Sequence, residues 1–298
     1  MNTNRPIIPR PGASLAILFG TFFFFLCIFS LLTSFIAPHV SDATLVTRLE
    51  TFFQSLFIFI VPALITAMLA TRLPATMLGI DRKPKLTPTL YIIAATIVAV
   101  PAMDTIVNWN ASIHLPESMS AIEQSIRNME DMAQEATRTL MGSDTIGSLI
   151  ITILIVGIMA PLSEELFFRG AMQRTFRATG LNSHVTVWLV AVIFSFMHFQ
   201  FFGFVPRLLL GAFFGYILLW GNNLWYAIIA HATNNILATV TNWQPMHLDA
   251  AVNPEAITGV AETVTPASPT WDVLLIGASL LLTVLTIIRL RRVLNKNA

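Results

Sequence analysis

Charge is what this chain of 298 residues has least of: only 11% of its residues are charged, whereas 55% are hydrophobic. A water-soluble domain carries about 25% charged residues, so the composition excludes an ordinary soluble globule. It also excludes a disordered chain, because such chains are poor in hydrophobic residues. The formal net charge of +1 gives no reason to expect a nucleic-acid partner.

Cysteine is nearly absent as well. The single residue Cys27 excludes an intrachain disulfide framework and a cysteine-rich metal site. The sequence also lacks internal repeats, a Walker loop and a dinucleotide fingerprint. These absences remove the common nucleotide-binding classes from consideration.

Long uncharged stretches are what the sequence has instead. Crossing a bilayer as a helix takes about 20 apolar residues, and eight stretches come close to that length. They run from Leu15 to Ala37, Phe52 to Thr71, Thr89 to Val107, Thr145 to Leu162, His184 to Phe199, Phe204 to Trp220, Leu224 to Val240 and Val273 to Ile288. Because backbone polar groups need internal partners in lipid, we predict an all-α fold: one integral membrane domain over residues 1–298, a bundle of about eight transmembrane helices.

The positions of lysine and arginine predict the orientation, since positively charged loops stay in the cytoplasm. With both termini cytoplasmic, 13 of the 17 cations lie inside, and only Arg48, Arg127, Arg138 and Arg207 lie outside. We expect a bacterial inner (cell) membrane. The external segment 110–143 gathers acidic residues and predicts an amphipathic helix that begins near Pro116. A solvated or interfacial helix is its ordinary interpretation, and control of substrate entry is the alternative.

Ionisable residues within the spans are informative, because placing them there costs several kcal/mol. The first cluster is Glu164, Glu165 and Arg169. On a helix Glu165 and Arg169 are i,i+4 neighbours that can form an ion pair, while Glu164 is rotated by about 100°. One carboxylate is then neutralised locally and the other is available. The competing interpretation is that all three charges mark a cytoplasmic helix end.

Two histidines and an amide complete the set. His198 is the one histidine within a long apolar stretch, where a hydrogen-bonded packing role is its ordinary interpretation. His231 and Asn235 share a helix face at i,i+4, where a hydrogen bond between helices is the ordinary interpretation. With a free carboxylate, however, these side chains are the parts needed to activate a water and stabilise an oxyanion. The combination therefore predicts a hydrolytic site.

Three motifs in this order resemble a known family. They are Glu-Glu-xxx-Arg at Glu164, Glu165 and Arg169, Phe-xxx-His at Phe194 and His198, and His-xxx-Asn at His231 and Asn235. Together they resemble the CPBP intramembrane metalloproteases, also called the CAAX protease and bacteriocin-processing (Abi) family. The stretch 211–235, GAFFGYILLWGNNLWYAIIAHATNN, is similar to the glycine-spaced helix, short turn and histidine helix of that family. The resemblance covers residues 145–241, the predicted protease core.

The resemblance implies a CAAX-type intramembrane endopeptidase, a peptide hydrolase, whose active site lies in a cavity within the bilayer and has six catalytic residues. In it, Glu164 activates the attacking water and His198 helps to hold that water. His231 and Asn235 form the oxyanion hole, while Glu165 and Arg169 fix the helix and the electrostatics around Glu164. The expected partners are membrane lipid and a peptide or lipidated-peptide substrate. Relatives either trim prenylated proteins after a C-terminal cysteine or are linked to bacteriocin processing and immunity, and the residues favour neither.

A metal is an open point of the predicted chemistry. Glu164, His198 and His231 match the composition of a His2Glu zinc site, so zinc is one option. There is no HExxH pair, however, and using Glu164 as a ligand would leave only the paired Glu165 as a nearby base. We therefore prefer direct catalysis by glutamate and histidine.

Two further expectations concern geometry. Glu164 and His198 can meet only if the fourth helix extends through Phe176, with Glu164 deeper than hydropathy suggests, or if the fifth helix begins nearer Trp188. Gly211 and Gly215 form a G-x-x-x-G motif that predicts close helix packing.

The alternative function is a non-proteolytic transporter or scaffold with buried Glu and His as an ion or proton site. A transporter of this kind would often show inverted repeats, which the sequence lacks.

Overall fold

The structure, a computed structural model, describes residues 8–143, 145–252 and 269–297, and within these ranges it contains helices and no strand. The helices of the first half are α1 (Pro11–Ile36), η1 (Ala37–His39), α2 (Ala43–Gln54), η2 (Ser55–Ile60), α3 (Val61–Ala70), α4 (Pro74–Leu78), α5 (Leu86–Val98), α6 (Val100–Ala111), η3 (Glu117–Met119) and α7 (Ser120–Met141). Those of the second half are α8 (Ile146–Thr152), η4 (Ile153–Met159), α9 (Ala160–Glu165), η5 (Leu166–Gln173), α10 (Arg174–Ala178), α11 (Ser183–Phe196), η6 (Phe201–Gly203), α12 (Phe204–Gly221), α13 (Leu224–Val252) and α14 (Pro269–Asn297). Segments η2, η4 and η5 are π-helical. The prediction of an all-α membrane bundle is confirmed.

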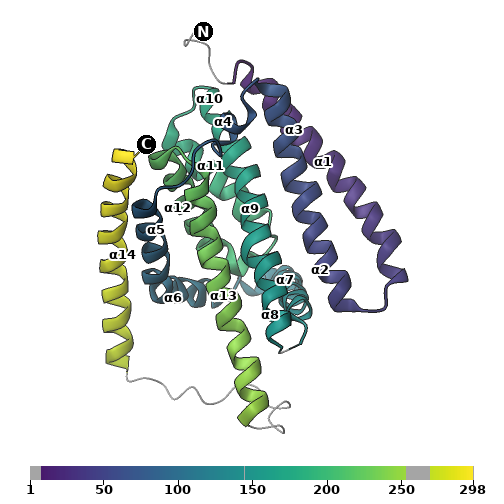
Figure 1. Cartoon of the computed structure of the whole chain (residues 1–298). Helices are drawn as coiled ribbons and strands as arrows, with labels where there is room; N and C mark the ends of the chain where they lie inside the picture. Colours follow the sequence, from purple (N-terminus) through teal and green to yellow (C-terminus); the bar gives the residue numbers. More distant parts are fainter. Residues whose placement is uncertain (1–7, 144, 253–268, 298) are drawn as a thin grey trace.

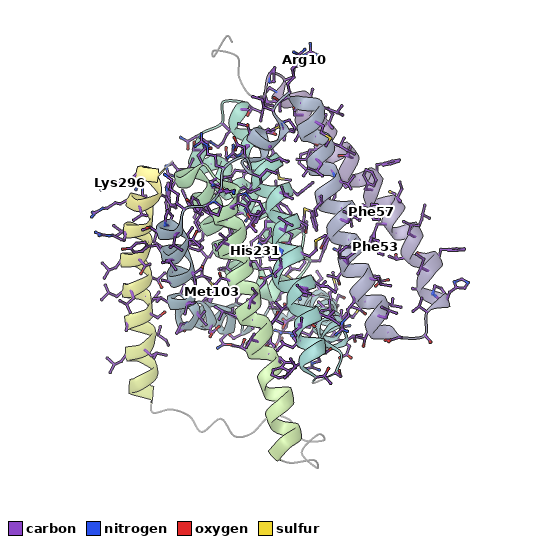
Figure 2. All side chains as sticks on the ribbon, viewed as in Figure 1. Arg10, Phe53, Phe57, Met103, His231 and Lys296 are labelled. Atoms are coloured by element: carbon purple, nitrogen blue, oxygen red, sulfur yellow. The ribbon has the colours of Figure 1, made fainter. Side chains whose placement is uncertain are left out.

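The helices form a bundle with the motif-bearing segments at its centre. Figure 1 shows α1, α2 and α3 on one side, α14 on the opposite side, and α9, α12 and α13 between them. Helix α1 begins and α14 ends at the same end of the bundle, where Figure 2 labels Arg10 and Lys296. A chain that crosses the membrane an even number of times, as the sequence predicts, has its first and last helices begin and end on the same side.

The predicted count of eight spans is not confirmed. In the described part of the chain, five helical stretches are long and apolar enough to cross a membrane: Pro11–His39, Ala43–Ala70, Ile146–Ala178, Phe201–Gly221 and Val273–Lys296. A sixth is counted if α5 and α6, bent by 44°, form one span. The fifth predicted span is α11, which has only 14 residues, and the seventh lies in α13, whose apolar run is interrupted by His231, Asn234 and Asn235.

Local sequence fixes the ends of the helices that carry the motifs. The Asn182 side chain accepts hydrogen bonds from the amides of His184 and Val185 and so caps the start of α11. Helix α12 ends at Gly221 and is capped by Asn222, whose φ of +45° is left-handed, a conformation that asparagine tolerates better than most residues. This tight turn leads directly into α13, in agreement with the short turn that the resemblance implies.

Aromatic side chains fill the core around the motif helices. Phe167 and Phe168, both 1% exposed, belong to the largest fully buried side chains. Their ring centroids lie 5.1 Å apart in a T-shaped pair, and Phe168 forms a second T-shaped pair with Phe194 at 5.2 Å. Burial of such rings contributes most of the packing energy, so the core holds η5 firmly against α11.

Candidate active site

Glu164 and Glu165 lie halfway along a continuous helical stretch. This stretch runs from Ile146 to Ala178 without a break, so it extends past Phe176 and both glutamates lie deeper than the predicted span end at Leu162 suggested. Figure 2 likewise shows His231 at mid-height of the bundle, well away from Arg10 and Lys296. The helix extension that the first adjustment required is therefore present, whereas α11 begins at Ser183 and not near Trp188.

Glu165 is the hub of the site. Its Oε1 accepts a hydrogen bond from Arg169 Nη1 at 2.9 Å and lies 2.9 Å from His231 Nδ1. The side chains of Glu165 and Arg169 are fully buried, and that of His231 is 6% exposed. The predicted i,i+4 ion pair is thus present, but it also reaches across to α13. Charged groups buried so deeply must be paired and hydrogen-bonded, and this arrangement pairs them.

Arg169 and Gln173 join this helix to α12 in a repeating pattern. Arg169 Nη2 donates to the carbonyl oxygen of Gly211 at 2.9 Å, and one turn later Gln173 Nε2 donates to that of Gly215 at 3.0 Å. The predicted G-x-x-x-G motif packs closely: a Cβ at Gly215 would lie 3.0 Å from Val187 Cγ1. The two glycines therefore let α12 approach the glutamate helix and α11 at the same time.

His231 links the two glutamates. Because Glu165 Oε1 is an acceptor, Nδ1 of His231 carries the proton of that hydrogen bond. Its Nε2 then faces Glu164, whose Oε2 lies 3.9 Å away. Glu164 Oε2 is buried and has no hydrogen-bond partner in the described part of the protein. Glu165 Oε2 also has no hydrogen-bond partner there. The two carboxylates therefore differ in that Glu165 Oε1 contacts both Arg169 and His231, whereas the nearest charged partner of Glu164 Oε2 is His231 Nε2 at 3.9 Å.

Aromatic rings enclose the two histidines. Phe214 stacks on His231 with ring centroids 4.7 Å apart, and Phe194 lies edge-on to His198 at 4.9 Å and to His231 at 5.9 Å. His198 Nδ1 lies 2.8 Å from the carbonyl oxygen of Phe194 and donates to it, which leaves Nε2 with a lone pair. His198 also lies within electrostatic range of Glu164 and His231.

Asn235 lies one turn after His231 and contacts another helix. Its Nδ2 donates to the carbonyl oxygen of Val156 in η4 at 3.1 Å, and its Oδ1 accepts from Asn234 Nδ2 at 3.3 Å. One of the two amide protons on Nδ2 is used by Val156, and the other is left for a further acceptor. The interhelical hydrogen bond that we considered as the ordinary interpretation is therefore present.

The predicted zinc ligands do not form a preassembled metal site. Among the residues that the structure describes, no three His, Cys, Asp or Glu side chains converge in a way that could hold a metal ion. The predicted ligands Glu164, His198 and His231 are consequently not arranged as a His2Glu centre. We derive no step of the chemistry through a metal.

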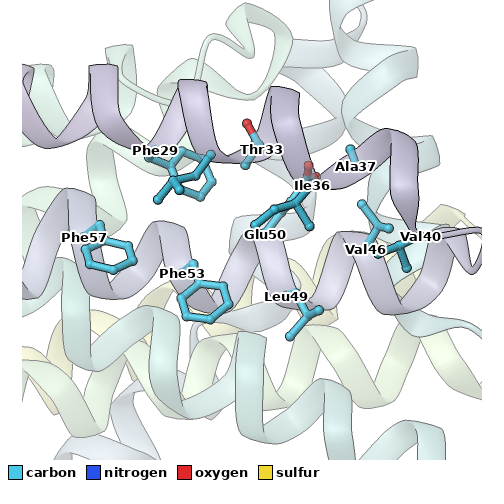
Figure 3. A pocket seen from close by; sticks show the side chains of 11 residues that line it. Phe29, Thr33, Ile36, Ala37, Val40, Val46, Leu49, Glu50, Phe53 and Phe57 are labelled. Atoms are coloured by element: carbon cyan, nitrogen blue, oxygen red, sulfur yellow. The ribbon is translucent and has the colours of Figure 1, made fainter.

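Two cavities of the described structure do not include the predicted catalytic residues. An apolar groove of about 290 Å³ separates α1 from α2, with Glu50 among Phe29, Phe53 and Phe57 (Figure 3). A larger cavity of about 910 Å³ lies between α5, α6, α12, α13 and α14, and Asp104 and Asn234 line it. None of the six predicted catalytic residues lines either cavity.

Sequence reasoning missed several residues of the site. Gln173, Phe214 and the carbonyl oxygen of Gly211 all hold predicted residues in place. One signal was available for Gln173: its spacing of four from Arg169 equals the spacing of Gly211 and Gly215. Phe214 gave no signal, because it is one of 22 phenylalanines in the chain.

Comparison with known proteins identifies this same region. Residues 146–237 match the Rce1-like family, described as type II CAAX prenyl endopeptidase Rce1-like. This stretch runs from α8 into α13 and contains all six predicted catalytic residues. No curated protein and no solved structure matches the chain. Residues 146–237 thus confirm the resemblance to the CAAX protease family that the three motifs predicted.

Proposed function

We propose that the protein is an integral-membrane endopeptidase of the CAAX type, which hydrolyses a peptide bond of a peptide or lipidated-peptide substrate in or near the bilayer. One observation carries the proposal: Glu164 Oε2 is buried without a hydrogen-bond partner among the described residues, 3.9 Å from an imidazole whose other nitrogen is bound to Glu165. Two neighbouring carboxylates with different environments can take different roles, and here Glu165 is the paired, positioning carboxylate while Glu164 is available to transfer protons.

In the proposed reaction, Glu164 takes a proton from a water while the water oxygen attacks the carbonyl carbon of the substrate. The lone pair on His198 Nε2 accepts the other proton of this water in a hydrogen bond, because Nδ1 is engaged by Phe194. A positioned general base of this kind contributes about 10²-fold to 10⁴-fold to a rate.

The tetrahedral intermediate carries its negative charge on the former carbonyl oxygen. Asn235 Nδ2 has one proton left to donate to it. His231 Nδ1 is engaged by Glu165, so His231 Nε2 can donate to the oxyanion only in the form of the ring that carries a proton on both nitrogens. Glu164 then returns its proton to the leaving amine as the C–N bond breaks, which gives a carboxylic acid and an amine and regenerates the Glu164 carboxylate. Oxyanion donors are typically worth about 10²-fold to 10³-fold each.

Cleavage of a pooled peptide and lipopeptide library by purified protein in nanodiscs tests this proposal. We expect Glu164→Ala and His231→Ala to lower the rate by about 10²-fold or more while the proteins keep their fold. Glu135→Ala, which removes an exposed carboxylate on α7, is the matched control and retains activity. Equal cutting by all four proteins would remove both residues from the mechanism and favour the transporter or scaffold interpretation.

A zinc-dependent mechanism is the alternative, and treatment with a chelator distinguishes it from direct catalysis. We expect wild-type activity to survive exhaustive treatment with a chelator, because Glu164 and the two histidines act directly. Loss of activity on chelation, with recovery on adding zinc, would overturn direct catalysis and make Glu164, His198 and His231 the metal ligands.

The proposed orientation places both termini in the cytoplasm of a bacterial inner membrane, with 13 of 17 cations on that side. Cys27 is the only native cysteine. In a Cys27→Ser background, single cysteines at positions 10 and 296 should therefore react with a membrane-impermeant reagent only after the cells are opened.

A further inference from the structure

The backbone beside His198 is strained. The His198 loop, residues 197–203, joins α11 to α12, and in it Phe199 has a φ of +53°. This left-handed conformation is unfavourable for a bulky residue, and such residues persist where the surrounding structure holds them. Because Phe199 directly follows His198, contacts that hold this loop also limit the positions open to the imidazole.

The end of α6 supplies the first of these contacts. Asn110 is 3% exposed and uses both ends of its amide on this region. Its Nδ2 donates to the carbonyl oxygen of Phe201 at 3.3 Å, and its Oδ1 accepts from the amide of Val205 at 2.7 Å. Asn110 thereby bridges the end of the His198 loop and the first turn of α12.

Helix α7 supplies the second set. Glu130 Oε2 accepts a hydrogen bond from the amide of Phe202 at 3.2 Å. The guanidinium of Arg127 lies 4.1 Å from the centroid of the buried Phe202 ring, within the range of a cation–π contact. Arg127 is itself fixed by Glu123, to which its Nε donates at 2.8 Å. One face of α7 therefore contacts both the backbone amide and the side chain of Phe202.

Helix α12 holds the loop from the other flank. Arg207 Nη1 donates to the carbonyl oxygen of Gln200 at 3.0 Å, and its Nη2 donates to the Gln200 side chain. A Cβ at Gly203 would lie 2.6 Å from Arg207 Nη1, so glycine leaves the space that the guanidinium occupies. Arg207 also lies within electrostatic range of Glu130 and Glu164.

We propose that the end of α6 and helix α7 form a clamp on the His198 loop, in which Asn110, Arg127 and Glu130 are positioning residues for hydrolysis. The clamp rests on the proposed function, in which His198 holds the attacking water. It gives the segment 110–143 a role in the reaction, beyond that of a solvated helix. A displacement of about 1 Å at a reacting group can cost 10²-fold in rate, so a loosened loop lowers kcat without removing any group that touches substrate.

Three variants of the full-length protein in nanodiscs test the clamp. Glu130→Ala removes the acceptor for the Phe202 amide and is expected to lower kcat by about tenfold or more, with KM changed by less than about twofold. Glu130→Gln retains a carbonyl acceptor at the same place and is expected to retain most of kcat. Glu135→Ala on the same helix, 70% exposed and 3.8 Å from Arg138, is the control for loss of charge.

Hydrogen exchange gives a readout that does not depend on catalysis. Amides in residues 197–207 are expected to exchange faster in Glu130→Ala than in wild type, and at the wild-type rate in Glu130→Gln and Glu135→Ala. If Glu130→Ala does not fold, Arg127→Gln, which removes the cation from the Phe202 ring, serves in its place with a smaller expected loss of kcat.

The outcomes separate the clamp from the proposed function. A wild-type protein that hydrolyses its substrate, together with Glu130→Ala at full kcat, refutes the clamp and leaves the protease intact. Glu130→Gln as impaired as Glu130→Ala refutes it as well, because the hydrogen bond is then not the cause. Hydrolysis that does not depend on Glu164 or His198 refutes the proposed function itself.

Discussion

Replacing Gly211 by alanine tests whether close packing of α12 sets the geometry of the site. A Cβ at Gly211 would lie 3.1 Å from Phe194 Cδ1 and 3.3 Å from Ala191 Cα. Ordinary contacts between carbon atoms are about 3.5–4.0 Å, so α12 must move from α11 by a few tenths of an ångström. The Gly211 carbonyl oxygen moves with it, and its 2.9 Å hydrogen bond from Arg169 lengthens.

The magnitude follows from two opposing effects. Inserting a methyl group into a packed interior costs about 1–3 kcal/mol, whereas alanine gains roughly 0.5–1 kcal/mol over glycine within a helix. At Gly277 on α14, a Cβ would meet no atom within 4 Å, so Gly277→Ala has only the gain. The free energies of unfolding of the two variants should therefore differ by about 1–3 kcal/mol, with Gly211→Ala the less stable.

Melting temperature and hydrolysis rate, measured on the same detergent-solubilised samples, provide the assay. Gly211→Ala should melt below Gly277→Ala and lose activity in proportion, and Gly211→Leu should lose activity with a lower melting temperature still. The reasoning would be wrong if Gly211→Ala matched Gly277→Ala in melting temperature and the wild type in activity.

Three other predictions follow from the charged groups. Arg169→Leu leaves the Glu165 carboxylate buried without its cation and should destabilise the protein by about 3–5 kcal/mol. The double variant Arg169→Leu with Glu165→Gln should have a higher melting temperature than Arg169→Leu alone. An equal melting temperature for both would argue against the ion pair. Glu165→Gln alone frees His231 from its charged partner and should lower kcat more than it changes KM, seen in steady-state kinetics. The Leu115 amide, Arg127 and His114 lower the pKa of Glu123 from 4.5 to about 2. This carboxylate therefore stabilises the fold above its unfolded pKa of about 4.5 and loses that contribution as the pH falls towards about 2. The difference in melting temperature between wild type and Glu123→Gln should thus narrow over that window, and a constant difference would contradict the assignment.

Much of the fold could be predicted because the hydrophobicity of a segment, and the need to hydrogen-bond its own backbone in lipid, depend on local sequence. Each of the eight predicted stretches lies in helical segments of the structure. The number of crossings could not be predicted in the same way, since a bend at Ala99 and the short α11 depend on neighbouring helices. The depth of Glu164 was misjudged from hydropathy for a related reason. The charged residues after Leu162 suggested the end of a span. Glu165 and Arg169 form an ion pair at 2.9 Å, however, and the helix continues through them.

The pairing within the site was only partly visible in the sequence. The i,i+4 spacing of Glu165 and Arg169 predicts their contact, because both lie on one helix. The sharing of Glu165 Oε1 with His231, 66 positions later in the chain, depends on how α13 packs against α9. The same holds for the His198 loop, whose partners Asn110 and Glu130 belong to the segment 110–143. For that segment the sequence suggested a solvated or interfacial helix or control of substrate entry, and neither interpretation names the loop as its partner.

The π-helical segments on both sides of α9 explain why periodicity alone could not orient Glu164. In a π-helix the hydrogen bonds run from i to i+5, and one extra residue rotates everything beyond it by about 100° relative to a regular helix. Segments η4 and η5 enclose the six residues of α9, so a period of 3.6 drawn from Ile146 assigns Glu164 to the wrong face.

Deleting Ile158 tests this account. Ile158 lies in η4 and is 44% exposed, so Ile158→Ala removes little packing and should keep most activity. Removing the whole residue should restore regular α-helical bonding in η4 while rotating the Val156 carbonyl relative to Glu164 by about 100°. Because Asn235 on α13 donates to that carbonyl, the two helices cannot both keep their contacts. We expect the deletion to abolish hydrolysis although hydropathy and helix content remain nearly unchanged. An active deletion variant would show that the π-helical turn has no part in positioning the glutamates.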